Sequence, residues 1–244
     1  MFSAFSFGKI IKTILPGAIL TVALLLLAEG AWGLLRPGTG FLLWKVPKDW
    51  ITPVTAALIP LSLILGFSLN TFAWMTLNRH MRARSDAMLR NTVFAAMRKK
   101  LSEGLWADSS EYFEKVGRPF EKELYPDRPP LEYYYLPLVS ITNLNYLWES
   151  YFCWYEFDIN TACALMVSAL AAGFLLSVKL RPSAYLLCGV VLLLVVGCAL
   201  CLVLTRAAVK NLVSYERNLV LLITSSLAKA AKNAQSPPTS DTVA

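Results

Sequence analysis

Four long apolar runs dominate the pattern of hydrophobic and polar positions along the chain. They cover residues 13–35, 51–77, 160–178 and 183–205, and each contains at most one formally charged side chain. About 20 apolar residues in a helix cross the ~30 Å hydrocarbon core of a bilayer, where a helix satisfies its own backbone hydrogen bonds. The pattern therefore predicts an all-α integral membrane protein with four transmembrane helices.

The polar segments divide the chain around these spans. We expect one transmembrane hairpin in residues 1–77 and a second in residues 160–205. Residues 78–159 hold most of the acids and the only histidine, and we expect them to form a helical cytoplasmic module between the hairpins. The helical pattern continues through residues 206–234 after the fourth span, whereas the polar, proline-containing residues 235–244 are expected to be disordered.

Within the middle segment, apolar residues recur at spacings of three, four and seven between residues 78 and 102. This is the period of an amphipathic helix, so we expect the second transmembrane helix to continue through this stretch. Asp108, Ser109 and Ser110 offer N-caps for a further helix, and the prolines of segment 125–131 end that helical run.

The beginning of the chain leaves two interpretations. Lys9 and Lys12 precede an apolar run, as in a cleaved signal peptide. The run is long for such a peptide and continues through residues 28–32 without a small-residue cleavage site, so we favour a retained span.

Lysine and arginine residues concentrate on one side of the predicted spans. Cytoplasmic loops carry such an excess, which predicts that both termini and residues 78–159 lie in the cytoplasm, under a cytoplasmic (inner) membrane. The net charge of +7 then reflects topology and attraction to anionic lipid headgroups, and we expect no nucleic-acid partner. The basic residues on that side are Arg79, Arg82, Arg84 and Arg90 after the second span, and Arg206, Lys210 and Arg217 after the fourth.

Aromatic residues crowd the approach to the third span. Aromatic side chains are enriched where a helix passes from headgroups to water, because they combine an apolar body with a polar edge. We therefore predict an inner-face belt formed by Trp148, Tyr151, Trp154 and Tyr155, with Trp74 at the matching depth on the second span.

Carboxylates in the same stretch require a further account, because an anionic leaflet does not attract them. Glu156 and Asp158 lie at the height at which the arginine-rich segment leaves the second span. We predict an interhelical ion pair between one of these carboxylates and Arg79, Arg82 or Arg84, with solvated charges as the alternative.

Polar residues inside the spans are functional candidates by default. Glu29 would either take part in a proton or cation pathway or, as we favour, reach the interface and pair with Arg36 or an outer-loop lysine. Ser62, Gly66 and Asn70 form a small and polar stripe on the second span, and Asn160 and Ser168 lie on a similar face of the third. We expect these faces to pack together, with Asn70 beside Asn160, in preference to lining a pore.

Candidate chemistry is sparse. The chain has no nucleotide-binding, zinc-protease or nucleophile-elbow motif, and no metal or cofactor is expected. Cys198 and Cys201 match a C-x-x-C spacing, but we interpret them as packing residues of the fourth span. For a membrane enzyme, the only groups worth testing are His80, Glu149, Glu156 and Asp158.

These patterns favour an interaction protein: a multi-pass anchor, scaffold or subunit that presents its cytoplasmic module to a protein partner or to another copy of itself. The alternative is a small oligomeric channel or membrane-perturbing effector gated by that module. In both cases the lipid bilayer is the surrounding partner.

Overall fold

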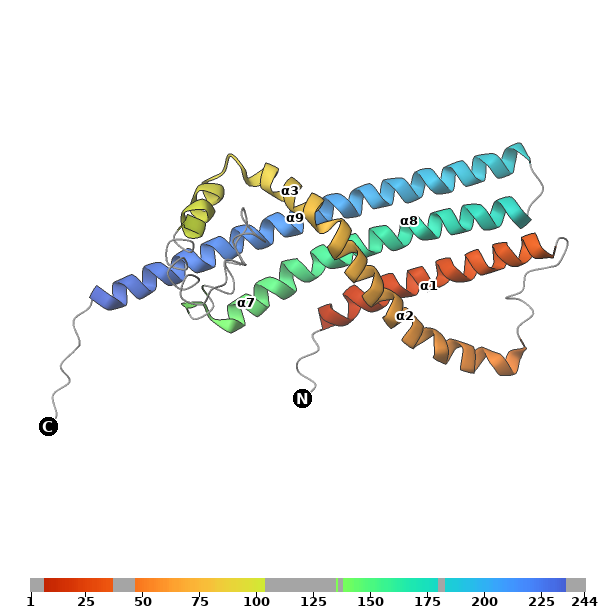
Figure 1. Cartoon of the computed structure of the whole chain (residues 1–244), viewed down its shortest axis with the longest axis horizontal. Helices are drawn as coiled ribbons and strands as arrows, with labels where there is room; N and C mark the ends of the chain where they lie inside the picture. The colour runs from red at the N-terminus through yellow and green to blue at the C-terminus, as the bar shows by residue number, and fades with distance from the viewer. Residues whose placement is uncertain (1–6, 37–46, 104–134, 136–137, 180–182, 236–244) are drawn as a thin grey trace, which may run out of the picture. The chain divides into compact units, whose positions relative to one another are not determined.

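The computed structural model describes residues 7–36, 47–103, 135, 138–179 and 183–235 (Figure 1). Every regular element in this described part is a helix, which confirms the predicted all-α class. The predicted N-caps at 108–110, the proline break at 125–131 and all but the first residue of the predicted tail lie outside it.

Four of the helices are long and apolar enough to cross a membrane. They begin and end close to the predicted spans, with two exceptions. Helical structure precedes the third apolar run from residue 141, and the fourth helix continues beyond its apolar run to residue 235. The helices are α1 (Phe7–Leu35), α2 (Lys48–Thr76), α8 (Cys153–Lys179), which a further helical stretch precedes, and α9 (Ala184–Gln235).

The second span does not continue as one helix to residue 102. After α2, helix α3 (Asn78–Leu89) ends in a turn, and a new helix covers residues 93–103. The Leu89 carbonyl accepts bonds from both the backbone N–H and the hydroxyl of Thr92, at 2.9 and 2.6 Å. These local bonds compete with the helical pattern and explain the turn.

The aromatic approach to the third span is also helical. Helix α7 (Ile141–Leu147) leads into a π-helical turn, η4 (Trp148–Phe152), and then into α8. The fourth span and the predicted C-terminal helix form the single 52-residue helix α9.

By its internal contacts the chain divides into two compact units. Unit 1 consists of Met1–Arg84 and Tyr151–Leu212, and unit 2 consists of Ser85–Ser150 and Val213–Ala244. Unit 1 contains the apolar spans, and unit 2 contains most of the segment predicted as a module together with the end of α9.

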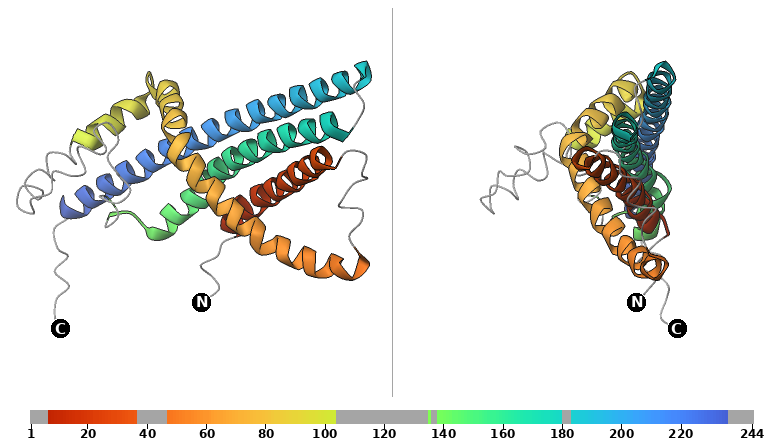
Figure 2. Two further views of the ribbon diagram at one scale, coloured as in Figure 1. Left: turned by 45° about the vertical axis from the view of Figure 1, so that its right-hand side comes forward. Right: turned by 90° about the vertical axis from the view of Figure 1, so that its right-hand side faces the viewer.

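Helix α8 is the central helix of unit 1. It packs along α1, touches the second half of α2, and meets α9 where the Cys201 thiol donates to the Ala162 carbonyl at 3.2 Å. Figures 1 and 2 show α1 and α8 side by side and running in the same direction. Small residues on α8 are buried and let its neighbours approach closely, as is typical of membrane helices; they are Ala162, Ala164, Ala169, Ala171 and Gly173.

Helices α1 and α2 cross at two glycines. A Cβ atom built on Gly17 would lie 1.9 Å from the Ser62 carbonyl oxygen, and one on Gly66 would lie 2.1 Å from the Thr13 carbonyl oxygen. Only residues without a side chain permit this approach of the two backbones. The first half of α2 bends away from α1 (Figure 1), and the two internal prolines, Pro53 and Pro60, account for the bend.

Unit 2 has a buried core of its own. The buried apolar residues of this unit include Leu89, Leu101 and Leu147, together with Leu219, Val220 and Ile223 of α9. The Tyr135 hydroxyl donates to the Leu101 carbonyl at 3.2 Å, which ties residue 135 to the end of the 93–103 helix.

Candidate functional site

Two ion pairs join the parallel helices α1 and α8 in unit 1. Lys12, near the beginning of α1, pairs with Glu156 in the first turn of α8. Glu29, in the last third of α1, pairs with Lys179 in the last turn of α8, with Nζ and Oε1 3.1 Å apart. The signs are exchanged between the ends, because α1 supplies the cation at one end and the anion at the other. The pairing therefore fits only the parallel arrangement in this register.

The Glu29–Lys179 pair is almost completely buried, with side-chain exposures of 1% and 8%. A charge in such surroundings is tolerated only when it is paired, because removing it from water costs several kcal/mol. The partner of Glu29 is Lys179, a lysine of the predicted outer loop. Arg36, the other predicted partner, lies over the Trp32 ring at 4.8 Å from its centroid.

The polar stripe of α2 is the face that packs against its neighbours. Ser62 Oγ lies 3.0 Å from Thr21 Oγ1 of α1, and either hydroxyl can donate to the other. The hydroxyl that does not donate across the helices donates to a carbonyl of its own helix, Leu58 for Ser62 or Gly17 for Thr21, at 2.8 Å. Asn160 of α8 donates its amide to Asn70 Oδ1 at 2.9 Å. The Ser168 hydroxyl, in the middle of α8, lies 2.9 Å from the Ala164 carbonyl of its own helix and 3.3 Å from the Ile19 carbonyl of α1, and its proton can be shared between them.

Two buried oxygens in α8 have no hydrogen-bond partner in the described structure: Asn160 Oδ1 and Thr161 Oγ1. Asn160 thus uses one side of its amide to hold α2 and leaves the other unsatisfied. Buried polar groups of this kind are rare and mark a position that accepts a water molecule or another donor.

Glu156 and Asp158 do not meet the arginines with which they were predicted to pair. Glu156 pairs with Lys12 of α1, and Asp158 accepts a 3.0 Å bond from Asn211 of α9. The physical reason is the position of α8, which packs along α1 and makes only limited contact with α2. The sequence indicates the height of each carboxylate but not which helix faces it.

The arginines of α3 are placed differently from one another. Arg82 donates to Asn78 at 3.1 Å and lies over the Trp74 ring at 5.6 Å. Arg79 and Arg84 are exposed. Asn78 itself accepts a 2.9 Å bond from the Tyr155 hydroxyl, which joins the beginning of α3 to α8.

The residues of the predicted aromatic belt differ in their exposure. Trp154 and Trp74 are exposed, whereas Tyr155 is 2% exposed and belongs to the core. Phe152 lies 5.5 Å from the Tyr155 ring and 6.1 Å from the Trp74 ring, so these residues also pack α8 against α2. Trp148 and Tyr151, in the π-helical turn, are half-buried.

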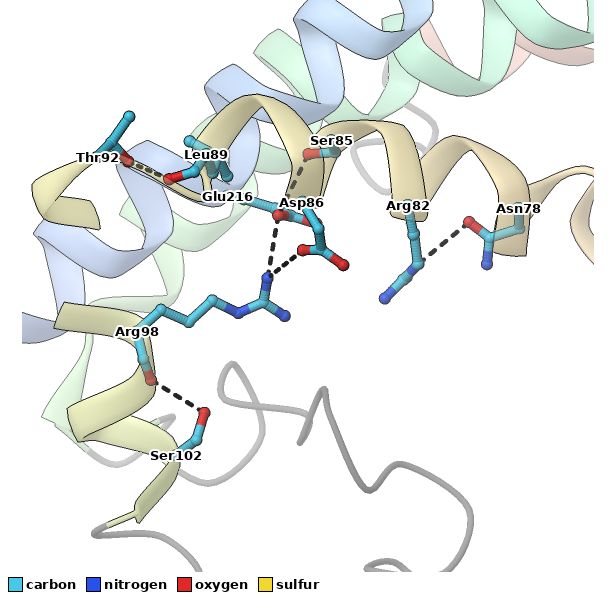
Figure 3. A network of polar contacts seen from close by, with 9 residues as sticks. All are labelled: Asn78, Arg82, Ser85, Asp86, Leu89, Thr92, Arg98, Ser102 and Glu216. Atoms are coloured by element: carbon cyan, nitrogen blue, oxygen red, sulfur yellow. Dashed lines mark hydrogen bonds and ion pairs between the residues drawn. The ribbon is translucent and has the colours of Figure 1, made fainter. Parts of the chain in front are cut away.

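Unit 2 contains a second buried polar cluster, drawn in Figure 3. Glu216 of α9 accepts a bond from Arg98 at 3.2 Å and a longer one from the buried Ser85 at 3.4 Å. Arg98 also pairs with Asp86 at 3.3 Å. The next residue in α9, Arg217, lies 5.0 Å from the centre of the Phe94 ring. These contacts fasten α3, the 93–103 helix and α9 to one another.

The cluster around Glu216 was not predicted from the sequence. Glu216 is the only acidic residue between Asp158 and Asp241, and a lone carboxylate in an otherwise apolar and basic helical run was the available signal. Lys12 was also overlooked as a pairing residue, because it stands at the end of a span, where a lysine ordinarily reaches the headgroups.

Catalytic groups do not gather in the described part of the chain. His80 and Glu149 are exposed, and no three His, Cys, Asp or Glu side chains there are placed to hold a metal ion. Cys201 is buried against α8, whereas Cys198 is exposed, and neither forms a disulfide.

The fold and these contacts define an all-helical protein with four helices able to span a membrane, locked together by buried polar contacts. Comparison of the chain with protein-family models, curated proteins and solved structures finds no match. Its function is therefore argued from its own residues.

Proposed function

We propose that this protein is a multi-pass membrane anchor. Unit 1 would be embedded in the bilayer, and unit 2 would be a folded cytoplasmic module that engages a protein partner or a second copy of the chain. The positive charge that flanks the second and fourth spans supports a cytoplasmic position for both termini and for unit 2.

The observation that carries the proposal is the use of polar side chains in unit 1. Glu29, Ser62, Asn70, Asn160 and Ser168 each contact another helix of the same chain. A conduction path needs polar groups that face an open lumen. Side chains that join helices instead favour a rigid anchor, because such contacts hold transmembrane helices together.

The core of unit 2 supports the second half of the proposal. Glu216 and Arg98 fasten separate helices, and the apolar core around Leu219 is buried. A segment that merely linked two hairpins would not require a core. Large apolar side chains remain exposed on the described part of this unit and offer contact area to a partner: Met88, Val93, Ile141 and Tyr146.

The alternative, an oligomeric channel, has one observation in its favour. Asn160 Oδ1 and Thr161 Oγ1 are buried without a partner, and a column of water along α8 would satisfy both. In that case several copies would have to surround the column, because one amide and one hydroxyl make a thin lining.

Site-specific photo-crosslinking in native membranes tests the anchor. A photoreactive residue at Val93, in unit 2, is expected to give a discrete protein adduct, either with a copy of the chain or with another protein. The matched control is Val203, in the apolar part of α9 and similarly exposed, which is expected to react with lipid.

Ion flux separates the two functions. Liposomes that contain the purified full-length protein are expected to remain tight. Leakage that disappears in Asn160→Leu, together with crosslinks between copies at Val203 and none at Val93, would overturn the anchor and establish the channel.

A further inference from the structure

Unit 1 has a basic surface at one end of its spans. Contacts made by α8 place the parts of this surface at the same height along the spans. The first turns of α8 bind Lys12 of α1 through Glu156, the beginning of α3 through Tyr155, and α9 through Asp158 and Asn211. The beginning of α1, the junction of α2 with α3, and residue 211 of α9 therefore lie at the same height along α8.

The exposed surface changes from apolar to basic at this height on two separate helices. On the α2–α3 side, the exposed Trp74 and Met75 are followed by the exposed Arg79. On α9, the exposed Val203 is followed by the exposed Arg206. At 1.5 Å per residue, each change occupies only about 4–6 Å along the helix.

Four basic side chains on this surface are not engaged elsewhere. Arg79, Arg84, Arg206 and Lys210 are exposed, and the described structure gives none of them a hydrogen-bond or ion-pair partner. Arg206 and Lys210 are four residues apart and so share one face of α9. The neighbouring carboxylates, Glu156 and Asp158, are buried and bind Lys12 and Asn211 instead.

We propose that this surface binds anionic phospholipid headgroups of the surrounding bilayer in preference to zwitterionic ones. Its four residues are Arg79, Arg84, Arg206 and Lys210. A lipid is favoured over a soluble polyanion because the basic side chains come immediately after exposed apolar side chains along each helix. The acyl chains of a lipid would cover these apolar side chains. Phosphate oxygens suit arginine, which can donate two parallel hydrogen bonds to them.

The inference depends on the membrane placement proposed above but not on what unit 2 binds. Each Lys or Arg near an anionic surface contributes roughly fivefold in affinity. A headgroup reached by one or two of the four side chains should therefore be preferred by about 5-fold to 25-fold at low ionic strength. The preference should weaken in 1 M salt, where the screening length falls to about 3 Å.

Lipid association measured by spin label tests the proposal. The full-length protein is reconstituted in phosphatidylcholine vesicles with a trace of spin-labelled phosphatidylglycerol or spin-labelled phosphatidylcholine, and the fraction of immobilised label is compared. The parent protein should prefer the anionic label several-fold. Arg206→Gln with Lys210→Gln should lose part of the preference, and addition of Arg79→Gln and Arg84→Gln should abolish it.

The matched control removes two cations from the other end of unit 1, by Arg36→Gln with Lys48→Gln. This variant should keep at least half of the parent's preference. Equal association of the two labels with the parent protein would overturn the proposal, as would equal losses in the control and in the Arg206/Lys210 variant.

Two further outcomes are separated by the same preparation. Failure of the protein to float with the vesicles would refute the membrane placement itself, whatever the headgroup. Tight binding of a fluorescent single-stranded oligonucleotide to the vesicle-bound parent, lost in the four-site variant, would assign the surface to nucleic acid and overturn the lipid proposal.

Discussion

The buried ion pair between Glu29 and Lys179 offers the strongest test of how unit 1 is held together. Glu29→Gln keeps the size of the side chain but removes the charge that faces the Lys179 ammonium 3.1 Å away. Because both side chains are buried, removing one partner should lower the free energy of unfolding by about 3–5 kcal/mol. Lys179 stands in the last turn of α8 and can shift toward the helix end, which favours the lower limit.

Two double variants separate the pair from its individual charges. Glu29→Lys with Lys179→Glu restores an ion pair and should recover all but about 0.3–1 kcal/mol, because a carboxylate in the last turn of α8 opposes the helix dipole. Glu29→Leu with Lys179→Leu removes both charges and should lie within about 1 kcal/mol of the parent, since an apolar replacement avoids the desolvation cost.

The assay is reversible unfolding in mixed micelles of mild detergent and dodecyl sulfate, followed by far-ultraviolet circular dichroism. The control is Lys99→Gln, which breaks an exposed pair with Glu103 at 3.8 Å and should change stability by no more than about 0.5 kcal/mol. If Glu29→Gln costs no more than this control, or if exchanging the charges restores nothing, the ion pair does not join α1 to α8.

Three further substitutions test other contacts. Gly66→Ala should lower stability by about 1–3 kcal/mol because its methyl group meets the α1 backbone, whereas Gly189→Ala, with open space around it, should be neutral or slightly stabilising in the same titration. Asn160→Ala should cost about 0.5–1.5 kcal/mol, and most of that cost should vanish when Asn70 is already alanine. Arg98→Gln deprives the buried Glu216 of an ionic partner and should speed hydrogen exchange across the 93–103 helix and residues 213–223; unchanged exchange there would refute the role of this cluster.

Much of unit 1 could be predicted from the order of residues alone. Apolar runs of membrane length specify helices, because no other element satisfies its backbone in hydrocarbon without a partner. The four-residue spacing of Ser62, Gly66 and Asn70 identifies one face of α2, and that face is the one that packs. Both results follow from local rules, namely length and helical period.

Helix ends in the middle segment were less predictable. The apolar period runs through residues 78–102 without interruption, yet Thr92 bonds to the Leu89 carbonyl and ends α3. The spacing of apolar residues does not reveal a side-chain hydrogen bond that competes with the helix. The turn also allows Arg98 to reach back to Asp86 and Glu216. In a continuous helix, Arg98 would lie farther along the helix axis, away from both carboxylates.

The sequence by itself determined the four long apolar helices, the faces that bear polar groups and the height of each charge along its helix. Only the tertiary structure decided the partners. Glu156 faces Lys12 and not an arginine because α8 packs along α1, and Glu29 faces Lys179 because the two helices run parallel. The physical reason is that helical period fixes direction around an axis, whereas the choice of neighbour depends on the combined packing of small residues on several helices.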